Sequence, residues 1–321
     1  MTDKERYREL CNNEPSIPIY SRDWWLDCVC GENKWNVLLY EKNGKIEASM
    51  PYYMPYKGII TMPPYTQTMG IWFNPEFEKE NYTKNLLWKQ NICEQLISRL
   101  PEHTFFIQNF HYSFTDWLPF HWKGFRQTTR YSYILQDIRD IERIEKNRSY
   151  DIKQNIKKAQ SKYQIEVKSN IHVDLFLEIY AKTFERQGKK AYQPEILRRL
   201  IEKTYSRNQG NTWGAFDETG KLHAAVFVAW RENCAYYIAG GSDSTGRKSG
   251  AHLLVLSEAI RAVSGISAAF DFEGSMIQGV ERIFRSFGAI QKPYFTISKG
   301  HRSLLRTSIN KLSNFLISRP K

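Results

Sequence analysis

Two carboxylates lie two residues apart at the predicted end of a buried strand. Residues Ala268–Glu273 are expected to form that strand, and its alternating side chains place Asp271 and Glu273 on the same side. Gly274-Ser275 then bends the chain into a helix. A carboxylate at this edge could accept a proton from an attacking amine if partial burial raises its pKa towards the working pH. The alternative is that Glu273 only caps the following helix.

A polar, glycine-rich loop follows another predicted strand in the run GGSDSTGRKSGAHLLVLSEAI. Backbone N–H groups and the positive end of the next helix could hold an anion there. The loop resembles the pyrophosphate-binding segment of GNAT acyltransferases, Q/R-x-x-G-x-G/A, although His252 stands where Gly or Ala is expected. This resemblance implies acyl-CoA as a co-substrate, whereas an ordinary helix-capping loop is the alternative. The candidate CoA contacts are Arg247, Lys248, Ser249, Gly250 and Ala251.

Several other polar residues are weaker candidates. Tyr236 and Tyr237 alternate across a predicted central strand, and Tyr237 is the candidate proton donor. Arg186 could hold a phosphate or carboxylate through its planar fork, and Lys157 and Lys158 could face nucleotide phosphates. Solvated surface positions are the alternative for all three cations. The seven histidines form no HxxxH or HxH pair, so no metal site is predicted.

The elements that would position these residues have the same order in both halves: helix, antiparallel strands, helix, strand. Expected in the first half are a helix at Ser21–Cys30, a hairpin at Asn43-Gly44, a helix at Asn81–Leu100, and strands at Thr104–Phe110 and Phe125–Asp137. Residues Asp140–Tyr163 are predicted to form a basic helical link. The second half is expected to contain strand Gln164–Ser169, helices Val173–Arg186 and Gln193–Arg207, three antiparallel strands, helix Gly250–Val263, helix Ile277–Phe287 and strand Tyr294–Ser298. This order suggests duplication without sequence repetition.

Five short segments carry a further resemblance, and they are spread over nearly the whole chain. They are PYTQTMGIW, FRQTTRYSYIL, NIKKAQ, TFERQG and FGAIQKPYFTISK, which accompany the DFEGSMIQGVERIFRSFG run. Together they resemble the FemAB-like branch of the GNAT superfamily, in its short form. The resemblance implies two tandem GNAT-like domains that bind a small-molecule or nucleotide-linked substrate, or an activated acyl carrier, in a cleft.

Two departures from that family favour one reaction over another. Fem-type aminoacyl transferases often insert a long helical hairpin associated with tRNA, and this chain has no such insertion. They can also carry Phe-Lys where this chain has Ile283-Phe284, so a cation that would stabilise charge at the reacting carbonyl is missing. Simple N-acylation is therefore favoured over tRNA-dependent peptide addition, although tRNA remains a possible partner.

Composition limits the setting of this chemistry. The chain has 321 residues, 41% of them hydrophobic and 25% charged, which predicts folded domains rather than disorder. No apolar run approaches the roughly 20 residues of a membrane span, and a cytoplasmic location is expected. Five scattered cysteines predict reduced thiols. The net charge of +12 suits an anionic partner, although solvated helix faces explain it equally well.

The sequence thus predicts an α/β (α+β) protein with two tandem GNAT-like domains and mixed, mostly antiparallel sheets. Their expected limits are 1–145 and 146–300, followed by a basic helix at 301–321 that could pack on the first domain. The expected function is N-acyl transfer to an amine, for example on an amino sugar of an envelope polysaccharide precursor. Aminoacyl-tRNA-dependent transfer and a catalytically silent binding module are the alternatives.

Overall fold

The computed structural model describes residues 1–186 and 188–300, and the helix expected at 301–321 lies outside them. Within the described residues the chain divides into two compact units. Unit 1 comprises residues 1–129 and the chain from residue 294, and unit 2 comprises residues 130–293. The domain limits expected at 145 and 146 remain a prediction.

The sheet of unit 1 has the strand order β1-β2-β3-β5-β12. These strands are β1 (Trp35–Lys42), β2 (Lys45–Tyr56), β3 (Ile59–Thr61), β5 (Phe105–Asn109) and β12 (Ile290–Gly300), and the short β4 (Trp72–Phe73) pairs with β2. Among the named strands of unit 1 in the described residues, only β3 and β5 pair in parallel. Asn43 and Gly44 both have positive φ, 52° and 75°, which is the geometry of the type I′ turn predicted for the β1–β2 hairpin.

Aromatic and aliphatic side chains cover this sheet on both faces. One cluster joins Leu38 and Phe106 to Ile92 and Leu96 of α3 (Tyr82–Ser98). On β1, Trp35 contacts Tyr7 of α1 (Asp3–Asn13) edge to face. Further helices of the unit are α2 (Asp23–Cys30) and α4 (Leu118–Trp122). β1 ends the strand order, but its central residues Val37, Leu38 and Leu39 are buried on both faces of the sheet.

The sheet of unit 2 has the strand order β6-β11-β10-β9-β8-β7. These strands are β6 (Arg126–Gln136), β7 (Glu166–Ser169), β8 (Gly210–Phe216), β9 (Leu222–Trp230), β10 (Cys234–Ser242) and β11 (Ala269–Asp271). All neighbours are antiparallel except β10 and β11, which are parallel. The predicted mixed, mostly antiparallel α/β architecture is confirmed.

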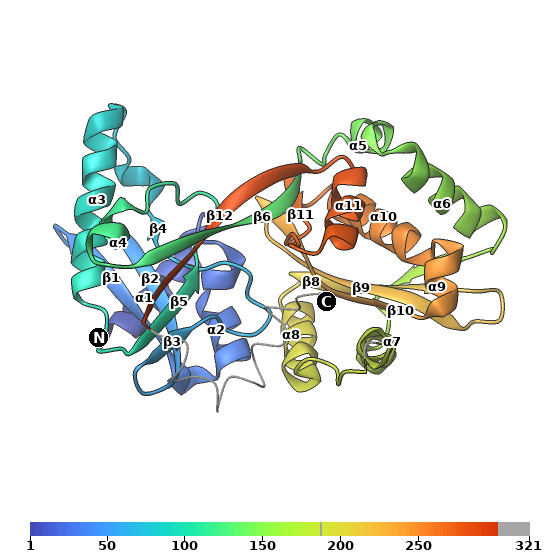
Figure 1. The fold of residues 1–321 in the computed structure, drawn as a ribbon, viewed down its shortest axis with the longest axis horizontal. Coiled ribbons are helices and arrows are strands. Elements are labelled where there is room, and N and C mark those ends of the chain that lie inside the picture. Colours follow the sequence, from blue (N-terminus) through green and yellow to red (C-terminus); the bar gives the residue numbers. More distant parts are fainter. Residues whose placement is uncertain (187, 301–321) are drawn as a thin grey trace. The chain divides into compact units, whose positions relative to one another are not determined.

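Helices cover both faces of the unit 2 sheet, as Figure 1 shows. α6 (Tyr150–Ser161) and α10 (Ala251–Val263) lie on one face, and α7 (Val173–Glu185) and α8 (Pro194–Ser206) on the other. Shorter helices are α5 (Ile141–Asn147), α9 (Ser244–Ser249) and α11 (Gln278–Ser286). An apolar cluster fills the space between the sheet, α10 and α11, so it fixes the elements around β11.

The two units share a strand arrangement and exchange one strand each. Unit 1 contains the antiparallel meander β1-β2-β3, and unit 2 contains the antiparallel meander β8-β9-β10. The last strand of each meander pairs in parallel with another strand, β3 with β5 and β10 with β11. The strand on the far side is antiparallel, and it comes from the other half of the chain. β6 follows β5 but pairs with β11, and β12 follows β11 but pairs with β5.

The predicted helical link at Asp140–Tyr163 is two helices rather than one. α5 ends at Asn147, Arg148 is extended with φ −61° and ψ 144°, and α6 begins after Ser149. The Oγ of Ser149 accepts a hydrogen bond from the Ile152 N–H, so a serine N-cap restarts the helix where no proline or glycine marks a break.

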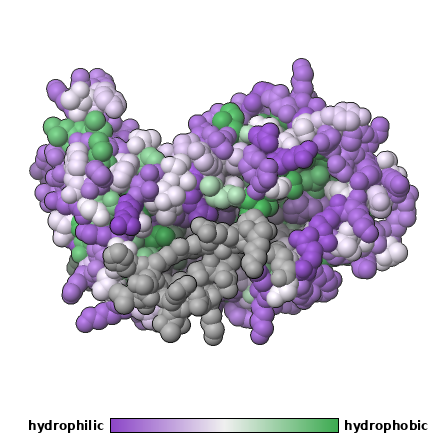
Figure 2. Space-filling view, in the orientation of Figure 1, coloured by the Kyte–Doolittle hydropathy of each residue, from purple (hydrophilic) through white to green (hydrophobic). Residues whose placement is uncertain are grey.

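Most of the surface visible in Figure 2 is hydrophilic, with apolar residues gathered in small groups. Within residues 1–186 and 188–300, no helix combines the length and apolar character needed to cross a membrane.

Candidate functional site

The predicted pair of carboxylates lies where β11 ends. Asp271 is the last residue of the strand and 4% exposed, and its Oδ1 accepts hydrogen bonds from the Ser132 hydroxyl and the Glu273 backbone N–H, the latter at 2.7 Å. Glu273 has a φ of 61°, and Gly274 follows with a φ of 64°. Two successive left-handed residues turn the chain sharply, which is unusual for a glutamate and costs about 1–3 kcal/mol.

Glycine at 274 is required by close backbone packing. A Cβ there would lie 2.0 Å from the Tyr131 carbonyl oxygen on β6. The turn therefore fits against β6 only with glycine, and it holds the Glu273 side chain in place.

Burial shapes the electrostatics of this turn. It raises the pKa of the Asp271 carboxyl to about 6, while the hydrogen bonds from Ser132 and the Glu273 N–H act in the opposite direction. It raises the pKa of Glu273 well above its usual range, and no other cause contributes. The Glu273 Oε1 is buried and has no hydrogen-bond partner among the described residues. Once it is ionised, a carboxyl with a buried, unused acceptor is suited to take a proton from a bound group.

β10 and β11 stay paired over only three residues. Their register joins Cys234 to Ala269, and it ends at Tyr236 and Asp271. β10 continues to Ser242 with an irregularity between Tyr237 and Ala239, paired only with β9 over this stretch. Beyond Tyr236 its edge therefore carries backbone groups that a ligand could pair with. Glu273 lies at the same strand end.

Tyr237 does not share a face with Asp271. Tyr236 and Asp271 are partners in the parallel pair, so the next residue, Tyr237, points to the opposite face. Its ring lies 6.3 Å from the rings of His252 and Phe284, and burial raises its pKa, which keeps the hydroxyl protonated. Its role as a proton donor remains a prediction.

The predicted phosphate-binding loop folds as α9, a glycine and the start of α10. Ser249 and Ala251 are fully buried, and a Cβ on Gly250 would lie 2.5 Å from the Asn155 carbonyl oxygen of α6. The Ala251 N–H donates to the Ser249 Oγ at 3.3 Å. Of the five predicted CoA contacts, only Arg247 and Lys248 are exposed, and the Arg247 guanidinium donates to the Ser242 carbonyl. The backbone at Ser249–Ala251 is packed against α6, so the groups of this loop that could contact CoA are the side chains of Arg247 and Lys248. That the loop binds CoA remains a prediction.

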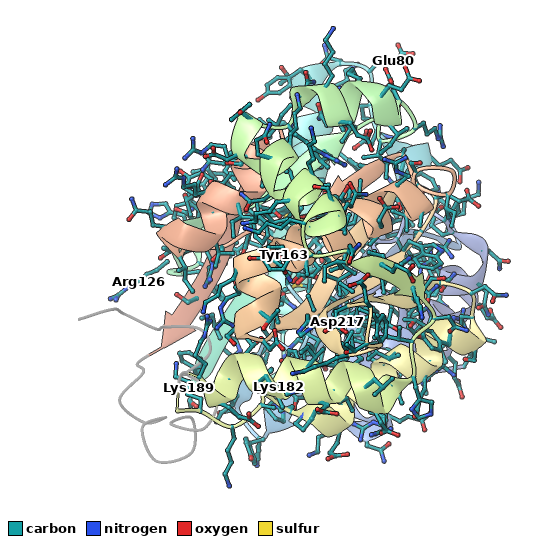
Figure 3. All side chains as sticks on the ribbon, turned by 90° about the vertical axis from the view of Figure 1, so that its right-hand side faces the viewer. Glu80, Arg126, Tyr163, Lys182, Lys189 and Asp217 are labelled. Carbon is teal, nitrogen blue, oxygen red and sulfur yellow. The ribbon has the colours of Figure 1, made fainter. Side chains whose placement is uncertain are left out.

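A buried histidine anchors the start of α9. His223 is 3% exposed, and its two ring nitrogens lie 2.9 Å from Asp217 and 2.8 Å from Asp243. Both ring nitrogens can donate to these carboxylates only when the ring is protonated. Asp243 also caps α9 through the Gly246 N–H at 2.7 Å, and Asp217, labelled in Figure 3, lies at the turn between β8 and β9. This triad was not predicted from the sequence, because Asp217 and Asp243 lie 6 and 20 residues from His223.

The other predicted binding residues are dispersed in unit 2. Arg186 is exposed at the C-terminal end of α7. Lys157 is exposed on α6 and lines a groove beside α10, whereas the neighbouring Lys158 is half-buried. Arg186 is not among the residues that line this groove. The binding roles of Arg186, Lys157 and Lys158 remain predictions.

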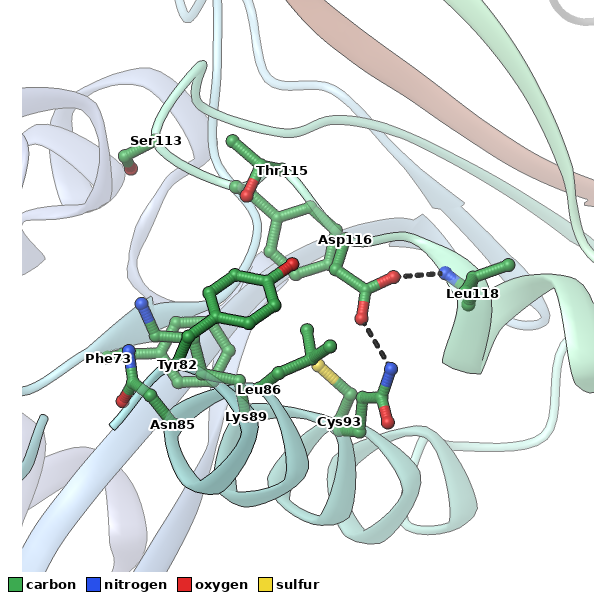
Figure 4. Close-up of a pocket in the computed structure, with 12 residues that line it drawn as sticks. Phe73, Tyr82, Asn85, Leu86, Lys89, Cys93, Ser113, Thr115, Asp116 and Leu118 are labelled. Atoms are coloured by element: carbon green, nitrogen blue, oxygen red, sulfur yellow. Dashed lines mark hydrogen bonds between the residues drawn. The ribbon is translucent and has the colours of Figure 1, made fainter. Parts of the chain in front are cut away.

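Unit 1 contains a pocket of about 390 Å³, shown in Figure 4. Phe73 and Phe114 lie parallel at 6.4 Å, and Lys89 lies over the Phe73 ring. Asp116 accepts hydrogen bonds from the Gln90 amide and the Leu118 N–H. Asp116 is hydrogen-bonded, and Lys89 forms an ion pair with Glu78. Both charged groups therefore already have partners, and the pocket is lined mainly by apolar contacts rather than by reactive groups.

The described residues hold no group of three or more His, Cys, Asp and Glu side chains arranged to bind a metal. That no metal takes part remains a prediction.

Comparison with known proteins defines the class. Residues 146–275 match the family described as "Acetyltransferase (GNAT) domain". FemX has a similar fold, with a TM-score of 0.67 at 9% identity over 92% of this chain and 96% of that one. L-PGS from Bacillus licheniformis gives 0.54 at 12% identity over 98% and 97%, and a tandem GNAT protein from the clavulanic acid biosynthesis pathway gives 0.50 at 10% identity over 92% and 94%.

These findings describe a tandem GNAT fold that carries a GNAT acetyltransferase domain. The predicted GNAT resemblance is confirmed by this domain match, and the similarity to FemX shows that the fold agrees with the FemAB-like branch. A GNAT domain supports acyl transfer in general, with acyl-CoA as the general donor. No curated protein matches the chain by sequence.

Proposed function

We propose that this protein transfers an acyl group from acyl-CoA to an amine, with an amino sugar of an envelope polysaccharide precursor as the acceptor. The observation that carries the proposal is the Glu273 carboxyl, which has a raised pKa and an unpartnered Oε1 where β10 and β11 part. The GNAT domain over residues 146–275 supports the reaction class.

In the proposed reaction, the amine nitrogen attacks the thioester carbonyl carbon while Glu273 takes the proton that the nitrogen loses. The C–S bond then breaks, the CoA thiolate leaves and takes up a proton, and an amide remains. No covalent enzyme intermediate is needed, because positioning and proton transfer suffice. Asp271 fixes the Glu273 backbone through the 2.7 Å hydrogen bond, so it acts as a positioning residue. Arg247 and Lys248 are the proposed contacts for the CoA phosphates.

A second candidate is transfer from an aminoacyl-tRNA. It is supported by the net charge of +12 and by the basic groove that contains Lys157. The fold of FemX is compatible with both candidates.

Release of CoA thiol from acetyl-CoA, measured with a panel of UDP-amino sugars, tests the first candidate. Amine-dependent release is expected. If acetyl-CoA is not consumed but a charged tRNA is, the second candidate replaces the first. If neither donor is consumed and either one still stabilises the protein against heat, the chain is a binding module.

A further inference from the structure

The groove of unit 2 that Lys157 lines has a volume of about 430 Å³ and lies beside the α5–α6 break and α10. Its walls carry five cationic side chains and two carboxylates, Glu145 and Glu258. The cations are Lys146, Arg148, Lys153, Lys157 and Arg261. The groove therefore favours an anion.

Arg148 is the buried centre of this groove. It is 7% exposed, and its Nε and Nη2 are buried without a hydrogen-bond partner in the described part of the chain. The nearest carboxylate oxygen, Glu145 Oε1, is 3.8 Å from Nη2, which is too far for a hydrogen bond, and this oxygen already accepts one from Arg261. The Phe287 ring lies 5.6 Å from the guanidinium. Buried N–H groups without acceptors are costly, so the site is incomplete without a ligand that accepts.

The fold holds Arg148 in this position through the break between the helices. The Ser149 N–H donates to the Ser286 carbonyl at 2.8 Å, which ties the break to the end of α11. Because Arg148 is extended and α6 restarts at Ser149, the guanidinium points inward instead of continuing along a helix surface.

The remaining charges leave the inner position open to an anion. Glu145 pairs with Arg261 at 2.5 Å and also lies 3.8 Å from Arg148, and Glu258 lies 3.9 Å from Arg261, so Glu145 is held closer to Arg261 than to Arg148. The Lys153 ammonium donates to the Lys146 carbonyl, and the Lys157 side chain is exposed at the rim.

We propose that this groove binds a phosphate group, which Arg148 holds from inside and Lys153 and Lys157 hold from the rim. A guanidinium matches two phosphate oxygens with parallel N–H bonds, and the surplus of cations over carboxylates suits a doubly charged group. The phosphate belongs either to a small phosphorylated molecule or to a nucleic-acid backbone. The site is separate from Glu273 and does not depend on the acyl-transfer proposal.

Thermal stability and binding titrations with inorganic pyrophosphate and with a short single-stranded RNA test this site on the full chain. Pyrophosphate is expected to raise the melting temperature of the wild type, because it binds only the folded state. Arg148→Met should weaken pyrophosphate binding by about tenfold or more. Without ligand, its melting temperature should stay the same or rise, because a buried charge with N–H groups that lack acceptors is removed. Lys203→Met, at an exposed position on α8, is the matched control and should bind as the wild type does.

Binding of RNA alone, weakened in Arg148→Met and unchanged in Lys203→Met, would support the site and identify a nucleic-acid backbone as the phosphate source. Binding of neither probe, or equal loss in both variants, would overturn it. If Arg148→Met fails to fold, Lys157→Gln decides: a loss of about threefold in pyrophosphate affinity supports the site, and unchanged affinity contradicts it.

Discussion

At the level of single residues, the proposed acyl transfer depends on how burial changes the pKa of Glu273. Its carboxyl has no hydrogen-bond partner for Oε1 among the described residues, and burial alone raises its pKa. The backbone is also held in a left-handed conformation. Backbone strain and desolvation at one residue both reduce the stability of the folded protein. Such residues cluster at functional sites, so their presence at Glu273 supports its role as a proton acceptor.

The raised pKa predicts how stability depends on pH. Above pH 4.5 a glutamate in the unfolded chain is ionised, whereas the folded Glu273 keeps its proton up to its raised pKa. Folding therefore binds a proton in this range, and the wild type loses stability as pH rises, by at most ~1.4 kcal/mol per pH unit. Glu273→Gln lacks this loss.

Chemical unfolding of both proteins between pH 4.5 and 7 measures this effect. The stability advantage of Glu273→Gln should grow with pH. Asp271, with its pKa of about 6, contributes equally to both proteins. A constant difference across this range would show that Glu273 is solvated in the folded protein.

The sequence predicted some of these residues but not their partners. Alternation along a strand predicted Asp271 and Glu273 on one side, but β11 ends at Asp271 and Glu273 lies in the left-handed turn beyond it. Alternation could not show that Ser132 donates to Asp271, because that hydrogen bond spans 139 residues. Arg148 was not singled out, since a charged residue in a basic helical segment is expected on the surface, and only the break before Ser149 turns it inward.

At the scale of elements, the turn after β11 is the feature that positions the site. Gly274→Ala should destabilise the protein by about 2–4 kcal/mol, because its Cβ would meet the Tyr131 carbonyl at 2.0 Å and the φ of 64° disfavours alanine. Thermal or urea unfolding measures it.

Gly279→Ala is the matched control for that substitution. Gly279 lies in α11 with open space around its Cα, so alanine should stabilise by about 0.5–1 kcal/mol. Equal effects of the two substitutions would mean that the turn does not pack against β6.

The restart of α6 gives a second test at this scale. Ser149→Ala removes the hydroxyl that accepts the Ile152 N–H and should cost about 1 kcal/mol of stability in urea unfolding. Ser161→Ala, near the other end of α6, removes a hydroxyl that only donates to the Lys157 carbonyl and should change stability by less. A larger loss from Ser161→Ala would argue against the serine cap.

Hydrophobic periodicity predicted most elements within a few residues, as for α3 and α10. It predicted the hairpin turn because Asn-Gly has its own backbone preference. It failed at α5–α6 and α9, where caps made by Ser149 and Asp243 determine the boundaries and the apolar spacing continues across them.

At the scale of the whole molecule, the exchanged strands make each half depend on the other. A fragment of residues 1–145 would carry β6 but lack β12, and one of residues 146–321 would lack β6. Each fragment would leave a sheet without its last strand. Neither is expected to unfold cooperatively alone, whereas co-expression should restore a cooperative transition, measured by circular dichroism. Cooperative unfolding of either isolated fragment would contradict this dependence.

The tandem architecture was predicted from the repeated order of elements and from the family resemblance. The exchange of β6 and β12 was not, because the local sequence of a strand does not specify which distant strand it pairs with.

The most direct test of the central claim is the pH dependence of acyl transfer from acetyl-CoA to an amine acceptor by Glu273→Gln. Loss of the general base should lower kcat by about 10²–10⁴-fold. It should also remove the rise in rate with pH that follows ionisation of Glu273 in the wild type. Glu202→Gln, at an exposed position on α8, should behave as the wild type. If Glu273→Gln kept the turnover of the wild type at every pH over which the wild-type rate rises, Glu273 would not be the base.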